Sequence, residues 1–60
     1  EKIMNWYNIE LEIPFYGKEF ELIKASNEQE ANLIAIKKVV RKYKCLDYEV
    51  LVTSCRVIKD

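Results

Sequence analysis

The sequence predicts an α+β domain in which a three-stranded antiparallel or mixed sheet carries one helix on one face. Three observations predict this class. Residues 6–13 alternate between apolar and polar side chains, residues 25–44 place apolar side chains at helical spacing, and residues 46–57 are rich in β-branched residues. The chain order is therefore strand, strand, helix, strand. Because a crossover through a helix is right-handed, we expect the first strand in the middle, in the order 2-1-3.

The length of the chain predicts one domain over residues 1–60. Half of the 60 residues are hydrophobic, which is typical of a globular chain. A chain this short buries only about 60% of its unfolded surface, so its core is marginal. Self-association or a partner often stabilises such a small core.

The first two predicted strands form a hairpin. In residues 6–13, the odd positions are Tyr, Ile, Leu and Ile, whereas the even positions are Trp, Asn, Glu and Glu. Pro14 and Gly17 then interrupt the pattern, because Pro cannot donate to the ladder and Gly permits positive φ. The extended pattern resumes at Lys18 and continues to Ala25. Two strands joined by such a short loop are typical of a β-hairpin.

The length of the hairpin loop decides which residues are buried. A loop of two or four residues places Leu11 opposite Phe20 and Ile9 near Leu22, all on the buried face. A three-residue loop would place Phe20 opposite Glu12. We therefore expect an even loop, which gathers four glutamates on the outer face, namely Glu10, Glu12, Glu19 and Glu21.

Two residues of the second strand do not fit this pattern. Ile23 and Ala25 have the opposite parity to Phe20 and Leu22. Either a bulge after Leu22 turns them inward, or they lie on the outer face beside Trp6. Both alternatives remain open.

The predicted helix begins at a capping-box sequence. Asn27 with Glu30, or Ser26 with Gln29, has the required spacing. One helix face is expected to be buried and consists of Ala31, Ala35, Ile36, Val39, Val40 and Tyr43. The opposite face carries four cations with Ile34 among them, namely Lys37, Lys38, Arg41 and Lys44.

A single helix covers only one face of the sheet. We expect the third strand, residues 46–57, to bring Glu49 to the acidic end of the open face. The other end is expected to collect Trp6, Thr53 and Cys55. This arrangement gives the open face an acidic end and a partly apolar end.

The composition excludes several kinds of site. The chain has no His, so it has no Ser-His or Cys-His pair, and its one Gly excludes a glycine-rich phosphate loop. Cys45 and Cys55 are too few for zinc, and a strand between them would separate their Cα atoms by about 30 Å. We therefore expect no catalytic residue, metal, cofactor or disulfide. Two free thiols suit the cytoplasm, and no run of about 18 apolar residues predicts a membrane span.

The formal net charge is zero, but the two halves differ. Residues 1–30 carry seven glutamates and three lysines, whereas residues 31–60 carry seven cations and three acidic residues. This distribution argues against a polycation that coats nucleic acid.

The junction between the second strand and the helix reads Ala-Ser-Asn-Glu-Gln-Glu-Ala, from Ala25 to Ala31. With an alternating strand before it and an amphipathic helix and a strand after it, most of the chain resembles the small β-β-α-β proteins of phages and mobile elements, such as the DpnD/PcfM-like group. The resemblance implies this fold and an accessory role. It transfers no functional residue.

These patterns predict a non-catalytic module that binds another macromolecule. The preferred partner is a protein with a basic surface, which would contact Trp6 as anchor and five carboxylates, namely Glu10, Glu12, Glu19, Glu21 and Glu49. The simplest alternative is a solvated acidic face that prevents edge aggregation. A second is nucleic-acid binding through Lys37, Lys38, Arg41 and Lys44. A third is a structural homodimer.

Overall fold

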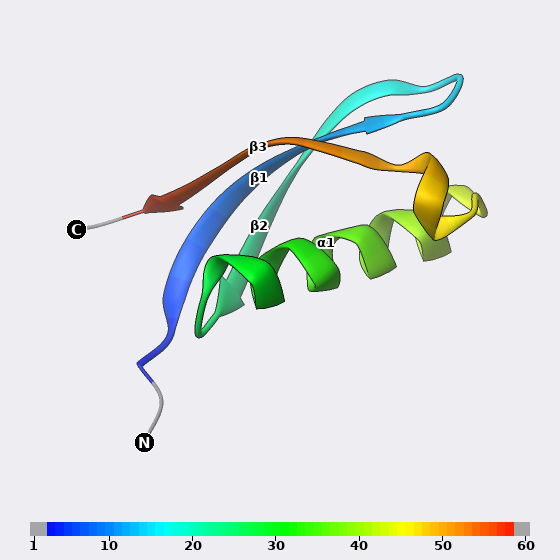
Figure 1. Ribbon diagram of the computed structural model, residues 1–60. Coiled ribbons are helices and arrows are strands. Elements are labelled where there is room, and N and C mark those ends of the chain that lie inside the picture. The colour runs from blue at the N-terminus through cyan, green and yellow to red at the C-terminus, as the bar shows by residue number, and fades with distance from the viewer. Residues whose placement is uncertain (1–2, 59–60) are drawn as a thin grey trace.

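The computed structural model of the chain describes residues 3–58 and confirms the predicted β-β-α-β order (Figure 1). Strands β1 (Asn5–Ile13) and β2 (Gly17–Ala25) precede helix α1 (Glu28–Tyr43), and strand β3 (Leu51–Ile58) follows it. The sheet is antiparallel with the order β2-β1-β3, and α1 runs along one of its faces. The predicted fold class and strand order are therefore both correct.

The start of the third strand was predicted too early. A 3₁₀-helix, η1 (Asp47–Glu49), occupies the positions before β3. The backbone N–H of Glu49 donates to the Leu46 carbonyl at 3.0 Å, and the Glu49 carboxylate accepts from the Leu46 N–H, also at 3.0 Å. These two reciprocal bonds stabilise the turn, so Glu49 does not belong to the sheet.

The core lies between α1 and the sheet. All four odd positions of β1 from Tyr7 to Ile13 are buried, as the alternation predicts. From the helix, Ala31, Ala35 and Val39 are buried, whereas Ile36, Val40 and Tyr43 are half-buried around them. The small side chains at positions 31 and 35 let this part of the helix approach the sheet closely.

The hairpin loop has three residues, so the expectation of an even loop is wrong. Ile13 pairs with Gly17, and the Tyr16 N–H donates to the Ile13 carbonyl at 3.2 Å. Phe15 has a φ of 70° and follows Pro14, as in a type II turn with Pro at its second position. Gly17 has a φ of 97°, a conformation that side chains with a Cβ rarely adopt.

With this register, the side chains of β2 point to the opposite faces of the sheet from those predicted. Phe20 lies opposite Glu10, not opposite Glu12 as expected for a loop of three residues. Leu22 lies opposite Asn8, so both apolar side chains face away from the helix. Ile23 instead pairs with Tyr7 and is buried, as is Ala25. Of the two alternatives for Ile23 and Ala25, the inward placement is correct, but no bulge produces it, because the whole strand faces the other way.

A bulge in β3 also changes the expected orientation of Cys55. Glu10 pairs with Ser54 but Leu11 pairs with Val52, so Thr53 is the extra residue. Its hydroxyl donates to the Glu10 carbonyl at 3.2 Å. After the bulge Cys55 pairs with Ile9 on the helix-facing side, so its predicted position on the open face is wrong.

One half of the capping box predicted for Asn27 and Glu30 forms, and the other half is displaced by one residue to Ser26. The Asn27 side-chain oxygen accepts from the Glu30 N–H at 2.8 Å. The Glu30 carboxylate in turn accepts from the Ser26 N–H at 3.2 Å and from the Ser26 hydroxyl at 3.1 Å. Helix α1 ends at Lys44, which adopts the left-handed conformation with a φ of 55°.

Substitution of one core leucine tests this packing. Leu11 is fully buried, so Leu11→Ala should lower the free energy of unfolding by about 3 kcal/mol. The matched control is Leu33→Ala, because the Leu33 side chain is 56% exposed on α1 and its truncation should change stability by less than about 0.5 kcal/mol. Urea unfolding followed by circular dichroism measures both. Equal losses for the two variants would contradict the assigned core.

Candidate interaction surfaces

The face of the sheet away from α1, here called the open face, carries an apolar surface. Five large apolar side chains lie on it, each between 45 and 63% exposed, namely Trp6, Phe20, Leu22, Leu51 and Ile58. Trp6 is therefore where the sequence predicted it. Phe20 and Leu22 were missed because the even loop assigned them to the core. Isolated exposed apolar residues are ordinary, but five on one sheet face are a candidate binding surface.

Charged side chains lie at both ends of the open face. Lys24 pairs with Trp6 near the start of β1, where its amine lies 5.9 Å from the centre of the indole ring. Glu12 lies at the hairpin end, six residues from Trp6 along β1, and pairs there with Lys18. Arg56 and Glu10 lie between these positions, with Arg56 nearer the Lys24 end. Lys18 forms an ion pair with Glu10 at 3.1 Å, which leaves Glu12 as the unpaired carboxylate among the described residues of this face.

The predicted cluster of five carboxylates on the open face is wrong. The three-residue loop places Glu19 opposite Leu11 and Glu21 opposite Ile9, on the side that faces α1. Glu49 lies in η1, although it borders the same hollow as Glu12 near the hairpin turn. Only Glu10 and Glu12 remain on the open face, because side chains of a strand alternate and one register change moves every side chain of β2.

Glu19 instead connects β2 to the end of α1. The Tyr43 hydroxyl donates to one carboxylate oxygen of Glu19, and the Lys42 amine lies 3.1 Å from the other. The Tyr16 ring packs against the Tyr43 ring with centroids 4.5 Å apart. The hydrogen bond from Tyr43 lowers the pKa of Glu19, and the same bond raises the pKa of Tyr43. Burial, with the neighbouring charge of Glu19, raises the pKa of Glu21.

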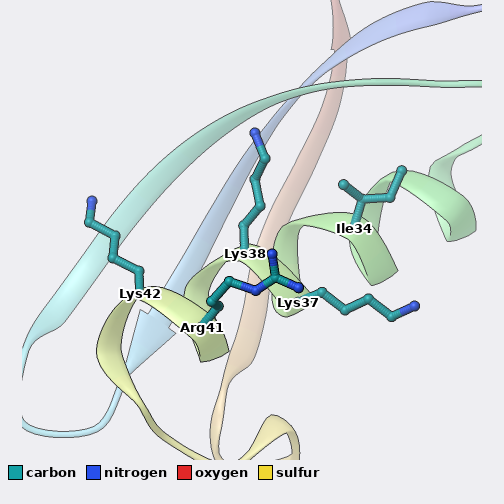
Figure 2. A pocket seen from close by; sticks show the side chains of 5 residues that line it. All are labelled: Ile34, Lys37, Lys38, Arg41 and Lys42. Atoms are coloured by element: carbon teal, nitrogen blue, oxygen red, sulfur yellow. The ribbon is translucent and has the colours of Figure 1, made fainter.

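A basic surface covers the outer side of α1. Ile34, Lys37, Lys38, Arg41 and Lys42 line one shallow hollow (Figure 2). Figure 2 shows the Lys38 and Lys42 side chains directed to one side of the helix and Lys37 to the other. Three of the four predicted cations are thus brought together with Ile34. The fourth, Lys44, ends the helix and does not line this hollow.

Lys42 was missed in the sequence analysis because it lies near the buried stripe. Its spacing of four residues from Lys38 was the available signal. Its amine is engaged by Glu19, whereas Lys37, Lys38 and Arg41 form no ion pair with any residue between positions 3 and 58.

The remaining chemistry of the described chain is limited. Cys45 and Cys55 are free thiols, and burial raises the pKa of Cys55. Within residues 3–58 no three His, Cys, Asp or Glu side chains converge as a metal ion would require. Over the same range no helix is long and apolar enough to cross a membrane.

Comparisons with models of known protein families, with curated protein sequences and with solved structures find no match for this chain. The resemblance to DpnD/PcfM-like proteins therefore stays a prediction. The candidate function rests on the two surfaces described above.

The Glu19 contact predicts how stability depends on pH. Because the pKa of Glu19 is lower in the folded chain than in the unfolded chain, its stabilising effect is present at neutral pH and is lost as the pH falls through the lowered value. Glu19→Gln should therefore unfold at a lower temperature than the wild type at pH 7. This difference should shrink once the pH is below the ordinary carboxyl range.

The matched control is Glu12→Gln, because Glu12 is exposed and forms no ion pair with a described residue. Thermal melts of the three chains between pH 2 and pH 8 make the comparison. A loss of stability in Glu19→Gln that is the same at every pH would contradict the role of the charged carboxylate.

Proposed function

We propose that this chain is a non-catalytic module that binds another protein through the open face. The observation that supports the proposal is the gathering of five exposed apolar side chains on this face, while the opposite face is covered by α1. Transfer of such a surface out of water is favourable by about 25 cal/mol for each Å² buried. A partner that covers this face would supply the packing layer that this side of the sheet lacks.

The composition of the open face suits a protein partner. Trp6 and Phe20 offer two aromatic side chains, the type that often dominates interface energetics. Leu22 and Ile58 extend this apolar surface on the two sides of β1. Charges of both signs surround it, so the favoured partner presents an apolar surface with mixed charges. This proposal replaces the uniformly basic partner expected from the sequence.

Paired substitutions on one face test the proposal. Phe20→Thr with Leu22→Thr removes the apolar side chains of β2 and keeps residues that favour a strand. The control is Leu33→Gln, which removes an apolar side chain of similar exposure from α1. The tagged chains are incubated with extracts of the cells that produce the protein, and the retained proteins are identified by mass spectrometry.

We expect a retained protein that binds the wild type and the Leu33 variant but not the β2 variant. Circular dichroism first establishes that all three chains are folded. Retention of the same proteins by all three chains, or of none by the wild type, would contradict the proposal.

The basic surface of α1 supports a second candidate function, the binding of nucleic-acid phosphates. Lys37, Lys38 and Arg41 are free of ion pairs with described residues and lie around one hollow. Cations that contact phosphates release counterions, so such binding weakens steeply with salt. Glu19 and Glu21 lie beside Lys42 and make the β2 side of this surface less favourable for a polyanion.

A salt titration tests this second candidate. If the surface binds nucleic acid, the affinity for a labelled RNA or DNA should fall between 50 and 200 mM salt by about tenfold or more for three phosphate contacts. Lys37→Gln with Arg41→Gln should reduce the salt dependence, whereas Lys18→Gln on the sheet should not. No binding in low salt, or equal binding by all chains, would exclude this function.

A further inference from the structure

We infer that the C-terminal end of α1 binds a single-stranded nucleic acid, with a phosphate on Lys37 and Arg41 and a base in a hollow beside them. This inference rests on the second candidate function and names the form of nucleic acid that the surface takes. The hollow, here called the end hollow, lies where the chain leaves α1 for η1. Its lining consists of Lys37, Val40, Arg41, Cys45, Leu46 and Asp47.

Two cations form a ridge between this hollow and the basic surface of α1. Lys37 and Arg41 line both the end hollow and the hollow that Figure 2 shows. They lie four residues apart on the helix, so their side chains are neighbours. Neither forms an ion pair with a residue between positions 3 and 58. A phosphate on this ridge would meet two free cations, and the nucleoside joined to it would reach over the end hollow.

The end hollow has an apolar floor that suits a base. Leu46 is 54% exposed, and Val40 and Cys45 are half-buried beside it. The hollow has a volume of about 570 Å³, which is large enough for a nucleobase. A base that covers Leu46 removes apolar surface from water, and the guanidinium of Arg41 can stack on its ring.

Asp47 gives the end hollow a preference among bases. Its side chain lines the hollow and forms no ion pair with a described residue. The negative charge repels a phosphate, so the phosphate is confined to the ridge. The carboxylate can accept a hydrogen bond from the amino group of cytosine. Thymine has no amino group, and its imino group lies between two carbonyls that repel a carboxylate, so the end hollow favours cytosine.

These features fit a single strand better than a duplex or an acidic peptide. In a duplex the bases are stacked and paired, so none can enter the end hollow without being unstacked. An acidic peptide would bring its carboxylates close to Asp47, where like charges repel. A single strand carries phosphates for the ridge and a free base for the hollow.

The preference for cytosine tests the inference. Fluorescence anisotropy at neutral pH and low salt measures the affinity for labelled oligodeoxycytidine, oligothymidine and a duplex of the same length. The wild type should bind oligodeoxycytidine about threefold to tenfold more tightly than oligothymidine, because one hydrogen bond is added. Asp47→Asn should reduce this ratio, because an amide can bond to either base.

A second variant tests the floor of the hollow. Leu46→Gln removes an exposed apolar side chain and should weaken the binding of both single strands by about fivefold, with duplex binding unchanged. The matched control is Leu33→Gln, because Leu33 is similarly exposed on α1 and lines neither hollow. Circular dichroism first establishes that all variants are folded.

Cys45 reports on the position of the single strand. Saturating oligodeoxycytidine should slow the reaction of Cys45 with iodoacetamide, because the base covers the thiol. Cys55 pairs with Ile9 in the sheet and should react at an unchanged rate. Mass spectrometry of the alkylated peptides measures both thiols. An unchanged rate at Cys45 would overturn the inference.

The outcomes separate this inference from the function on which it rests. Equal affinity for both single strands, with no loss in Leu46→Gln, would overturn the inference and leave phosphate binding by the basic surface intact. No binding of any oligonucleotide in low salt would contradict both. A polyglutamate peptide of equal charge that displaces oligodeoxycytidine at equal concentration would show that charge alone holds the ligand, and would also overturn the inference.

Discussion

The pairing of Ile13 with Gly17 determines what each face of the sheet displays. Side chains of a strand alternate, so this one pair fixes the orientation of every residue of β2. The turn that permits the pairing holds Phe15 at a φ of 70°, which costs of order 1–3 kcal/mol for a residue other than Gly. Burial of Ile23 and Ala25 in the core offsets that cost, because the opposite register would place both in solvent. The turn and the core of this domain therefore depend on each other.

The same pairing joins the helix to the sheet through polar contacts. Glu19 reaches the last turn of α1, where it accepts from Tyr43 and pairs with Lys42. Had the strand faced the other way, Tyr43 and Lys42 would have met an apolar side chain, and Glu19 would have lain on the open face. The lowered pKa of Glu19 shows that its charged form is favoured in this position. The polar contact beneath the helix and the apolar open face are thus two results of one register.

The parts of this fold that could be predicted are those in which the local sequence shows a single consistent pattern. Residues 7–13 of β1 alternate without exception, and Asn27 with Glu30 has the spacing of a helix cap, so these elements follow from local sequence. The orientation of β2 does not, because Phe20 and Ile23 offer apolar side chains of opposite parity. The bulge at Thr53 likewise depends on how β3 meets β1 and has no signal within β3. On the open face, the correct predictions are Trp6, Glu10 and Glu12, since the other positions depended on these two tertiary choices.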